Sequence, residues 1–273
     1  MESERVCTMF FSPTGTTEKV VTKIGATISN MICKPIKEIN FTLPRERENE
    51  YAFTRQDLVI FGVPVIAGRV PNVLLKFLET IKGNGALVVP IVVYGNRNYD
   101  DALKELRNIL KIDGFITIAG GAFIGEHSFS NTLAEGRPDE VDLNFAEEFA
   151  RTIGLKLQTL NEVVVTLVDE EKTLKEYYKP QDRYGNFIDI RKVKPKTNDN
   201  CNNCGMCVKV CPMGSINAAN AKEVTGICIK CGACIKKCPR SAKYYDDSNY
   251  LYHKTELEQL FTRKLEPKVF FKL

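Results

Sequence analysis

The stretch CNNCGMCVKVCP, residues 201–212, places four cysteines within eleven consecutive positions of a 273-residue chain. A second stretch, CIKCGACIKKCP at residues 228–239, has the same spacing 27 residues later. Gly205 and Gly232 match at this offset, and so do the prolines that close the two stretches. The segment is therefore an internal repeat of the pattern C-x2-C-x2-C-x3-C-P.

This spacing suits two iron–sulfur clusters. Three cysteines two residues apart let one loop surround a corner of a [4Fe–4S] cube, while the fourth, followed by proline, reaches the other cluster. Gly205 and Gly232 lie where the backbone must turn tightly. We therefore assign one cluster to Cys201, Cys204, Cys207 and Cys238, and the other to Cys228, Cys231, Cys234 and Cys211.

Disulfides and zinc are the alternative uses of these cysteines. Eight of the ten cysteines fall between Cys201 and Cys238 in a chain that shows no export signal, which disfavours a disulfide scaffold. Structural zinc sites usually take two separated pairs of ligands, which differs from a triple followed by Cys-Pro. We expect iron–sulfur ligands.

The segment from about Asn198 to Asp247 resembles the two-cluster bacterial ferredoxins. The resemblance implies a small α+β domain that transfers single electrons at low potential. The segment departs from the commonly acidic family because it holds seven Lys or Arg residues and four acids. Positive charge near a cluster favours its reduced form, and it changes which partners are attracted.

The first half of the chain opens with a strand, a loop and a helix. The apolar run RVCTMFF precedes SPTGTT at residues 12–17, and Val20, Ile24 and Ile28 then recur at helical spacing. A loop rich in hydroxyls at a helix N-terminus binds phosphate. The nucleoside triphosphate and dinucleotide patterns are both absent, so the loop fits a terminal monophosphate such as that of FMN. The alternative is a Ser/Thr helix cap with a turn.

More strands alternate with helices after this unit. Expected strands are residues 31–39, 57–65, 86–95 and 114–125, and expected helices are residues 70–81, 99–110 and 138–157. The alternation predicts an α/β fold with a doubly wound, five-stranded parallel sheet. Ligands of such sheets bind at the carboxyl ends of the strands, near the switch in strand order.

The loops at those ends resemble the FMN-binding loops of flavodoxins. FFSPTGTTEK resembles the phosphate loop, and GVPVIAGRVP and VVYGNRNYDDAL resemble the two flavin-ring loops, so the resemblance covers about residues 6–160. It implies a flavodoxin-like fold with noncovalent FMN. The implied phosphate contacts are Ser12, Thr14, Gly15, Thr16 and Thr17. The implied ring-side contacts are Pro64, Val65, Ile66, Gly68, Tyr94, Gly95, Asn96, Arg97 and Tyr99, with Tyr99 as the stacking candidate.

Several single residues have two interpretations. His127 is a candidate proton donor to flavin or substrate, and the alternative is a solvated loop histidine. Arg69 and Arg137 are expected to be surface residues, and the alternative is that they pair with phosphate or with the other domain. Cys7 and Cys33 lie in expected strand runs, so we expect them to be small buried side chains.

The sequence suggests four regions. Residues 1–160 are the expected flavodoxin-like domain, 161–197 a structured linker, 198–248 the ferredoxin-type domain, and 249–273 a C-terminal helix and tail that docks on either domain. The tail carries no expected chemistry.

Composition excludes some classes of protein. A net charge of +4 is too small to indicate a nucleic-acid binder, and no apolar run is long enough for a membrane span or a secretory signal. We therefore expect a cytoplasmic protein with soluble redox proteins as partners. A homodimer in which one chain's clusters face the other chain's flavin is left open.

The whole chain resembles the flavodoxin–ferredoxin fusion proteins of anaerobic microbes. The resemblance implies an electron carrier in which FMN and two [4Fe–4S] clusters relay low-potential electrons between partners. The alternative is an oxidoreductase that reduces a quinone, an enone or a nitro compound at FMN. A third class, a sensor or structural module, uses clusters only for folding. A substrate cavity over the flavin distinguishes the enzyme from the carrier.

Overall fold

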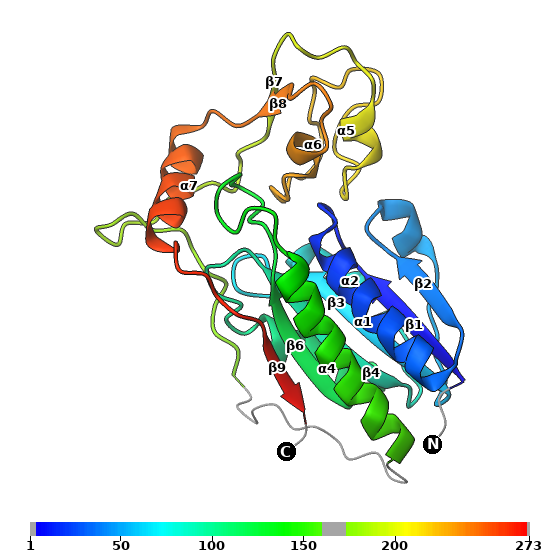
Figure 1. Ribbon diagram of the computed structural model, residues 1–273. Coiled ribbons are helices and arrows are strands. Elements are labelled where there is room, and N and C mark those ends of the chain that lie inside the picture. Colours follow the sequence, from blue (N-terminus) through cyan, green and yellow to red (C-terminus); the bar gives the residue numbers. More distant parts are fainter. Residues whose placement is uncertain (1–3, 160–172, 272–273) are drawn as a thin grey trace.

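The structure is a computed structural model that describes residues 4–159 and 173–271. Figure 1 shows a sheet with helices on both faces, and a smaller unit containing α5 and α6 beyond the carboxyl ends of its strands. The cysteine repeat thus lies at the edge of the sheet where ligands bind in doubly wound folds.

Within the described ranges, no helix has the length and apolar character that crossing a bilayer requires.

Strands and helices alternate through the first part of the chain. Its elements are β1 (Arg5–Phe10), α1 (Thr16–Ile32), β2 (Ile36–Asn40), η1 (Pro44–Glu48), β3 (Asp57–Pro64), η2 (Asn72–Leu74), α2 (Leu75–Leu78), β4 (Leu87–Tyr94), α3 (Ala102–Ile112), β5 (Ile116–Thr117), β6 (Ala119–Ile124) and α4 (Glu140–Thr159). The later elements are β7 (Lys196–Thr197), α5 (Met206–Lys209), α6 (Ala233–Lys236), β8 (Lys243–Tyr244), α7 (Ser248–Leu260) and β9 (Lys268–Phe271).

The strand order of the main sheet is β2-β1-β3-β4-β6-β9, and the short β5 also pairs with β4. All these pairs are parallel except β6 with β9, which is antiparallel. The first five strands of this order have the flavodoxin arrangement, in which the order reverses between β1 and β3. That reversal opens a crevice beyond the carboxyl ends of β1 and β3.

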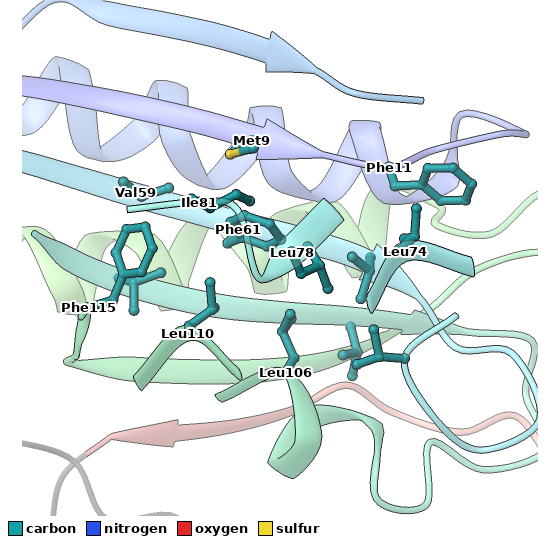
Figure 2. Packing of buried hydrophobic residues seen from close by; sticks show 14 of the residues in the cluster. Met9, Phe11, Val59, Phe61, Leu74, Leu78, Ile81, Leu106, Leu110 and Phe115 are labelled. Carbon is teal, nitrogen blue, oxygen red and sulfur yellow. The ribbon is translucent and has the colours of Figure 1, made fainter. Parts of the chain in front are cut away.

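Both faces of the sheet are covered, and each has its own apolar cluster. The central strands β3 and β4 are buried along nearly their whole length, which explains their unbroken apolar runs. Val20 and Ile24 of α1 pack with Phe149 of α4 on one face. Figure 2 shows the cluster on the other face, where Phe61 of β3 lies near Leu78 of α2. The layers are therefore helix, sheet and helix.

Gly62 sets how closely α1 approaches the sheet. A Cβ atom at this position of β3 would clash with Cγ2 of Val21 and lie 3.0 Å from Cγ2 of Thr17. Because glycine has no Cβ, the first turn of α1 rests directly on β3. The loop before α1 is thereby held at the crevice.

The C-terminal segment returns to the main sheet. Asp247 caps α7 by accepting a hydrogen bond from the Tyr250 N–H, at 2.9 Å. The chain then runs down to β9, which adds an antiparallel edge strand next to β6 (Figure 1). The tail therefore docks on the flavodoxin-like part and extends the expected parallel sheet by one strand.

Three further details differ from the sequence expectations. The expected strand at residues 31–39 begins only at Ile36, because α1 continues through Ile32. Cys33 is exposed rather than buried, since it ends α1 in a left-handed conformation with φ 53°. The expected helix at residues 70–81 is reduced to the short η2 and α2. The apolar run VVVTLVD of the linker lies outside the described residues.

Candidate functional site

The SPTGTT loop has unsatisfied hydrogen-bond donors. The Glu18 N–H donates to Ser12 Oγ at 2.9 Å, and the Lys19 N–H donates to the Gly15 carbonyl at 3.1 Å. The N–H groups of Thr16 and Thr17, in the first turn of α1, have no intrahelical acceptor. Thr17 is fully buried, and its Oγ1 has no hydrogen-bond partner among the described residues. These groups fit an anionic ligand oxygen at the helix N-terminus.

A cavity of about 280 Å³, here called the central cavity, lies beside this loop at the carboxyl ends of the strands. Its walls on the sheet side are Pro13, Thr14, Thr16, Pro64, Val65, Ile66, Ala67, Gly68, Val93, Tyr94, Gly95, Arg97, Asn98 and residues 125–129. The walls from outside the sheet domain are Tyr178, Pro180, Ile190, Arg191, Ile229, Lys230, Cys231, His253 and Leu257. The linker, the cysteine repeat and α7 therefore all border the central cavity.

Most of the expected flavin contacts meet at the central cavity. Thr14, Thr16, Pro64, Val65, Ile66, Gly68, Tyr94, Gly95, Arg97 and His127 line it, while Ser12, Gly15 and Thr17 lie in the adjoining loop. Asn96 and Tyr99 are not among the lining residues. The Asn96 side-chain amide donates to the carbonyls of Phe261 and Arg263, at 2.7 and 2.9 Å. The Tyr99 ring packs on Tyr94 in the core, with ring centroids 5.5 Å apart.

Tyr178 lines the central cavity, whereas Tyr99, the aromatic residue predicted there from the sequence, does not. The backbone N–H of Tyr178 donates to the Ala67 carbonyl at 2.8 Å, which joins the linker to the loop after β3. The Arg97 guanidinium lies 4.2 Å from the Tyr178 ring centroid, and His253 stacks on the same ring. The only sequence signal was a pair of adjacent tyrosines in a charged segment. Neither tyrosine could be placed without the tertiary fold.

His127 is held as a neutral imidazole. Burial, together with the positive charges of His253, Lys236 and Arg97, lowers the pKa of His127 to about 4. Its Nδ1 accepts a hydrogen bond from the Phe129 N–H at 3.1 Å, so Nε2 carries the proton. At neutral pH the side chain is therefore a hydrogen-bond donor rather than a charged acid.

The eight repeat cysteines gather in two places. Cys211, Cys228, Cys231 and Cys234 line one small cavity, and Cys201, Cys204, Cys207 and Cys238 line another. Because Cys231 also lines the central cavity, we call the first group the proximal set and the second the distal set. Each set takes three cysteines from one half of the repeat and one from the other. This is the crossed arrangement of two-cluster ferredoxins.

Both sets have the same local geometry. Gly205 and Gly232 precede α5 and α6 with φ angles of 73° and 74°. The fourth cysteine of each half accepts a backbone hydrogen bond at sulfur, from Ser215 to Cys211 at 3.4 Å and from Ala242 to Cys238 at 3.3 Å. Hydrogen bonds to sulfur are a feature of iron–sulfur sites. In the described parts of the chain, no three or more His, Cys, Asp or Glu side chains are arranged around a single metal ion.

The cysteine repeat is attached to the sheet domain by polar contacts. Lys236 of α6 forms an ion pair with Glu126 and donates to the Ser130 carbonyl at 2.8 Å. The pKa of Glu126 is lowered: burial raises it, but hydrogen bonds from Lys236 and from the Gly136 N–H outweigh that effect. On the other half of the repeat, Arg47 of η1 donates to the Pro212 carbonyl at 2.5 Å. Each half of the repeat is thereby fixed to a loop beside the crevice.

Glycine is required at position 232 of this interface. Gly232 has a positive φ, and a Cβ atom there would lie 2.5 Å from the Ser128 carbonyl oxygen. The loop between Cys231 and Cys234 can therefore approach the loop after β6 only because this residue has no side chain.

Replacing Thr17 with valine tests the phosphate loop. Valine keeps the shape and removes the unpartnered hydroxyl, so we expect the free energy of unfolding of the flavin-free protein to be unchanged or slightly higher. The dissociation constant for FMN should rise about ten- to hundredfold, as for loss of one hydrogen bond to a charged group. Fluorescence titration with FMN measures this, and Thr27→Val later in α1 is the matched control. An unchanged FMN affinity in Thr17→Val would remove Thr17 from the site.

Comparisons with known proteins find similarity to each of the two parts. Residues 200–243 match the family model of the 4Fe-4S dicluster domain. Among solved structures, oxidised Flavodoxin 1 from Bacillus cereus is 19% identical, covers 57% of this chain and 99% of its own, and has a TM-score of 0.44. A flavodoxin from the domain Archaea is 15% identical, with coverage of 56% and 99% and a TM-score of 0.41. A Fusobacterium nucleatum flavodoxin variant bound to flavin mononucleotide is 15% identical, covers 57% of this chain and 96% of its own, and has a TM-score of 0.38.

A search of curated proteins gives no match. The dicluster match and the observed strand order are independent of each other, since they concern different parts of the chain. Residues 200–243 match a 4Fe-4S dicluster domain and follow a sheet with the flavodoxin strand order, which fits the organisation of a flavodoxin–ferredoxin fusion.

Proposed function

We propose that this chain is an electron-transfer protein in which the distal cluster, the proximal cluster and FMN follow one another within a single chain. The observation that carries the proposal is that Cys231 lines both the proximal-set cavity and the central cavity. A cluster bound by Cys231 would therefore directly adjoin a flavin in the central cavity. When bound, FMN exchanges one or two electrons and each cluster exchanges one.

The residues of the chain would hold FMN in a defined orientation. The α1 N-terminus and the Thr14, Thr16 and Thr17 hydroxyls suit its phosphate. Val65 and Ile66 offer an apolar wall for the ring, and Tyr178 offers an aromatic surface from the linker. The neutral Nε2–H of His127 offers a hydrogen bond to a ring or substrate oxygen or nitrogen. These assignments follow from the lining of the central cavity.

The attachment of the repeat favours transfer within one chain. Lys236 and Arg47 bind it to the sheet domain at two points, and the C-terminal segment returns to β6. Both sides of the central cavity thus come from the same chain, so a second subunit is not needed for this path.

The exposed end of the path is the distal set. Cys204 of this set is exposed, and the nearby basic residues Lys209, Lys237 and Arg240 are exposed as well. Positive charge around an exposed cluster attracts negatively charged proteins and speeds their association. We propose that soluble, acidic redox proteins exchange electrons at the distal cluster.

A second candidate function is reduction of a small acceptor at FMN. It is favoured by the walls that Tyr178, His253 and Arg191 add to the central cavity, since a cavity over the flavin suits a substrate. Oxidation of the reduced protein by quinones, enones and nitro compounds separates the two functions. Saturation with one acceptor, lost in Tyr178→Ala, supports the enzyme. Rates that stay proportional to acceptor concentration for every compound support the carrier.

Rapid kinetics test the single-chain path. After anaerobic mixing with a limiting amount of a low-potential reductant, we expect electrons to pass from the clusters to the flavin at a rate independent of protein concentration. Stopped-flow absorbance at cluster and flavin wavelengths measures this rate. Cys234→Ser, which removes a proximal ligand, should slow flavin reduction at least tenfold. A rate proportional to protein concentration would instead indicate transfer between chains.

Charge reversal tests the proposed docking end. In Lys209→Glu/Lys237→Glu/Arg240→Glu, we expect the second-order rate constant for reduction by a reduced acidic two-cluster ferredoxin to fall about tenfold at low ionic strength. In the parent protein the same rate should fall with added salt. Lys76→Glu/Lys111→Glu, on α2 and α3, is the matched control and should leave the rate unchanged. A rate that is insensitive to both salt and the triple change would locate the docking surface elsewhere.

A further inference from the structure

The two halves of the repeat differ in charge at one matched position. Asn203 and Lys230 are 27 residues apart, and each lies directly before the second cysteine of its half. Both have a φ of 55°, in the left-handed region. Asparagine adopts this conformation readily, whereas lysine does so less often. The same backbone conformation therefore carries a neutral side chain beside the distal set and a cationic one beside the proximal set.

The Lys230 ammonium group is held in place by backbone oxygens. Its Nζ donates to the carbonyls of Arg191 and Cys228, each at 3.1 Å. Lys230 is half-buried and lines the central cavity next to Cys231. A positive charge is thereby fixed between the proximal set and the space proposed for the flavin. Asn203 instead accepts a hydrogen bond from the Ala221 N–H at 3.4 Å.

Two other basic residues, Lys243 and Arg240, line the distal-set cavity. Lys243 is buried and donates to the Ala221 carbonyl. Arg240 lines the distal-set cavity but is exposed, so water screens its charge. Lys230 lines the central cavity beside Cys231, and its Nζ lies 3.1 Å from the carbonyl oxygen of Cys228, so its charge lies on the side of the proximal set.

We propose that Lys230 raises the reduction potential of the proximal cluster, and so makes electron transfer from the distal to the proximal cluster more favourable than it would be without this cation. The proposal rests on the function proposed above. The four proximal cysteines are half-buried and Cys231 lines the central cavity, while Cys204 of the distal set is exposed. Burial opposes the added negative charge of a reduced cluster, and a fixed cation a few ångströms away offsets this effect. In the step itself, one electron leaves the reduced distal cluster and enters the oxidised proximal cluster, with no bond made or broken.

The experiment exchanges the two matched residues in the anaerobically reconstituted holoprotein. Lys230→Asn places at 230 the residue that the other half uses in this conformation, so it should fold and keep both clusters. Iron content and far-UV circular dichroism check this. In a redox titration followed by EPR, the equilibrium constant for electron transfer from the distal to the proximal cluster should fall about tenfold. This corresponds to a change of about 59 mV in the difference between the two midpoint potentials, for one-electron couples.

Two further variants complete the design. Lys230→Arg keeps the charge and should leave the midpoint potentials close to those of the parent. Asn203→Lys should raise the midpoint potential of the distal cluster, which Lys230→Asn leaves unchanged. Comparing the two variants therefore assigns each midpoint potential to one cluster. The proposal is overturned if Lys230→Asn shifts neither midpoint, or shifts both equally. If the parent protein does not bind two clusters, the proposed electron-transfer function is contradicted instead. Failure of the Lys230 proposal can therefore be told apart from failure of the proposed function.

Discussion

The attachment of α6 to the loop after β6 determines the geometry of the whole site. Lys236 pairs with Glu126 and with the Ser130 carbonyl, and Gly232 lets the two backbones touch at Ser128. A partly exposed ion pair contributes only about 1 kcal/mol, so its main effect is on position. This contact holds the loop that carries Cys231 at the central cavity, and the Arg47 bond to Pro212 fixes the other half of the repeat.

The C-terminal segment further fixes the position of the cysteine repeat relative to the sheet domain. Asn96 binds the carbonyls of Phe261 and Arg263, and β9 completes the edge of β6. A swinging domain would need such contacts to break together, at a free-energy cost that several hydrogen bonds and a strand pairing make large. These contacts favour a fixed position of the cysteine repeat on the flavodoxin-like sheet over a mobile one.

Local patterns in the sequence predicted the parts of the site that depend on local geometry. The crossed cysteine sets followed from spacing and an internal repeat, and the SPTGTT loop followed from a strand and a helix that flank it. Tyr178 and β9 could not be predicted, because their positions depend on contacts between segments more than 100 residues apart. Tyr99 and Asn96 were expected at the flavin from their place in a loop. In the structure the half-buried Tyr99 ring packs against Tyr94, and Asn96 binds the C-terminal segment.

We propose that one chain holds two clusters and one flavin. Chemical analysis of iron, acid-labile sulfide and FMN, on protein reconstituted and purified without oxygen, measures this content. We expect about eight iron atoms, about eight sulfides and about one FMN per chain, as for two [4Fe–4S] clusters. Zinc in place of iron, or iron at this level with no retained FMN, would contradict it.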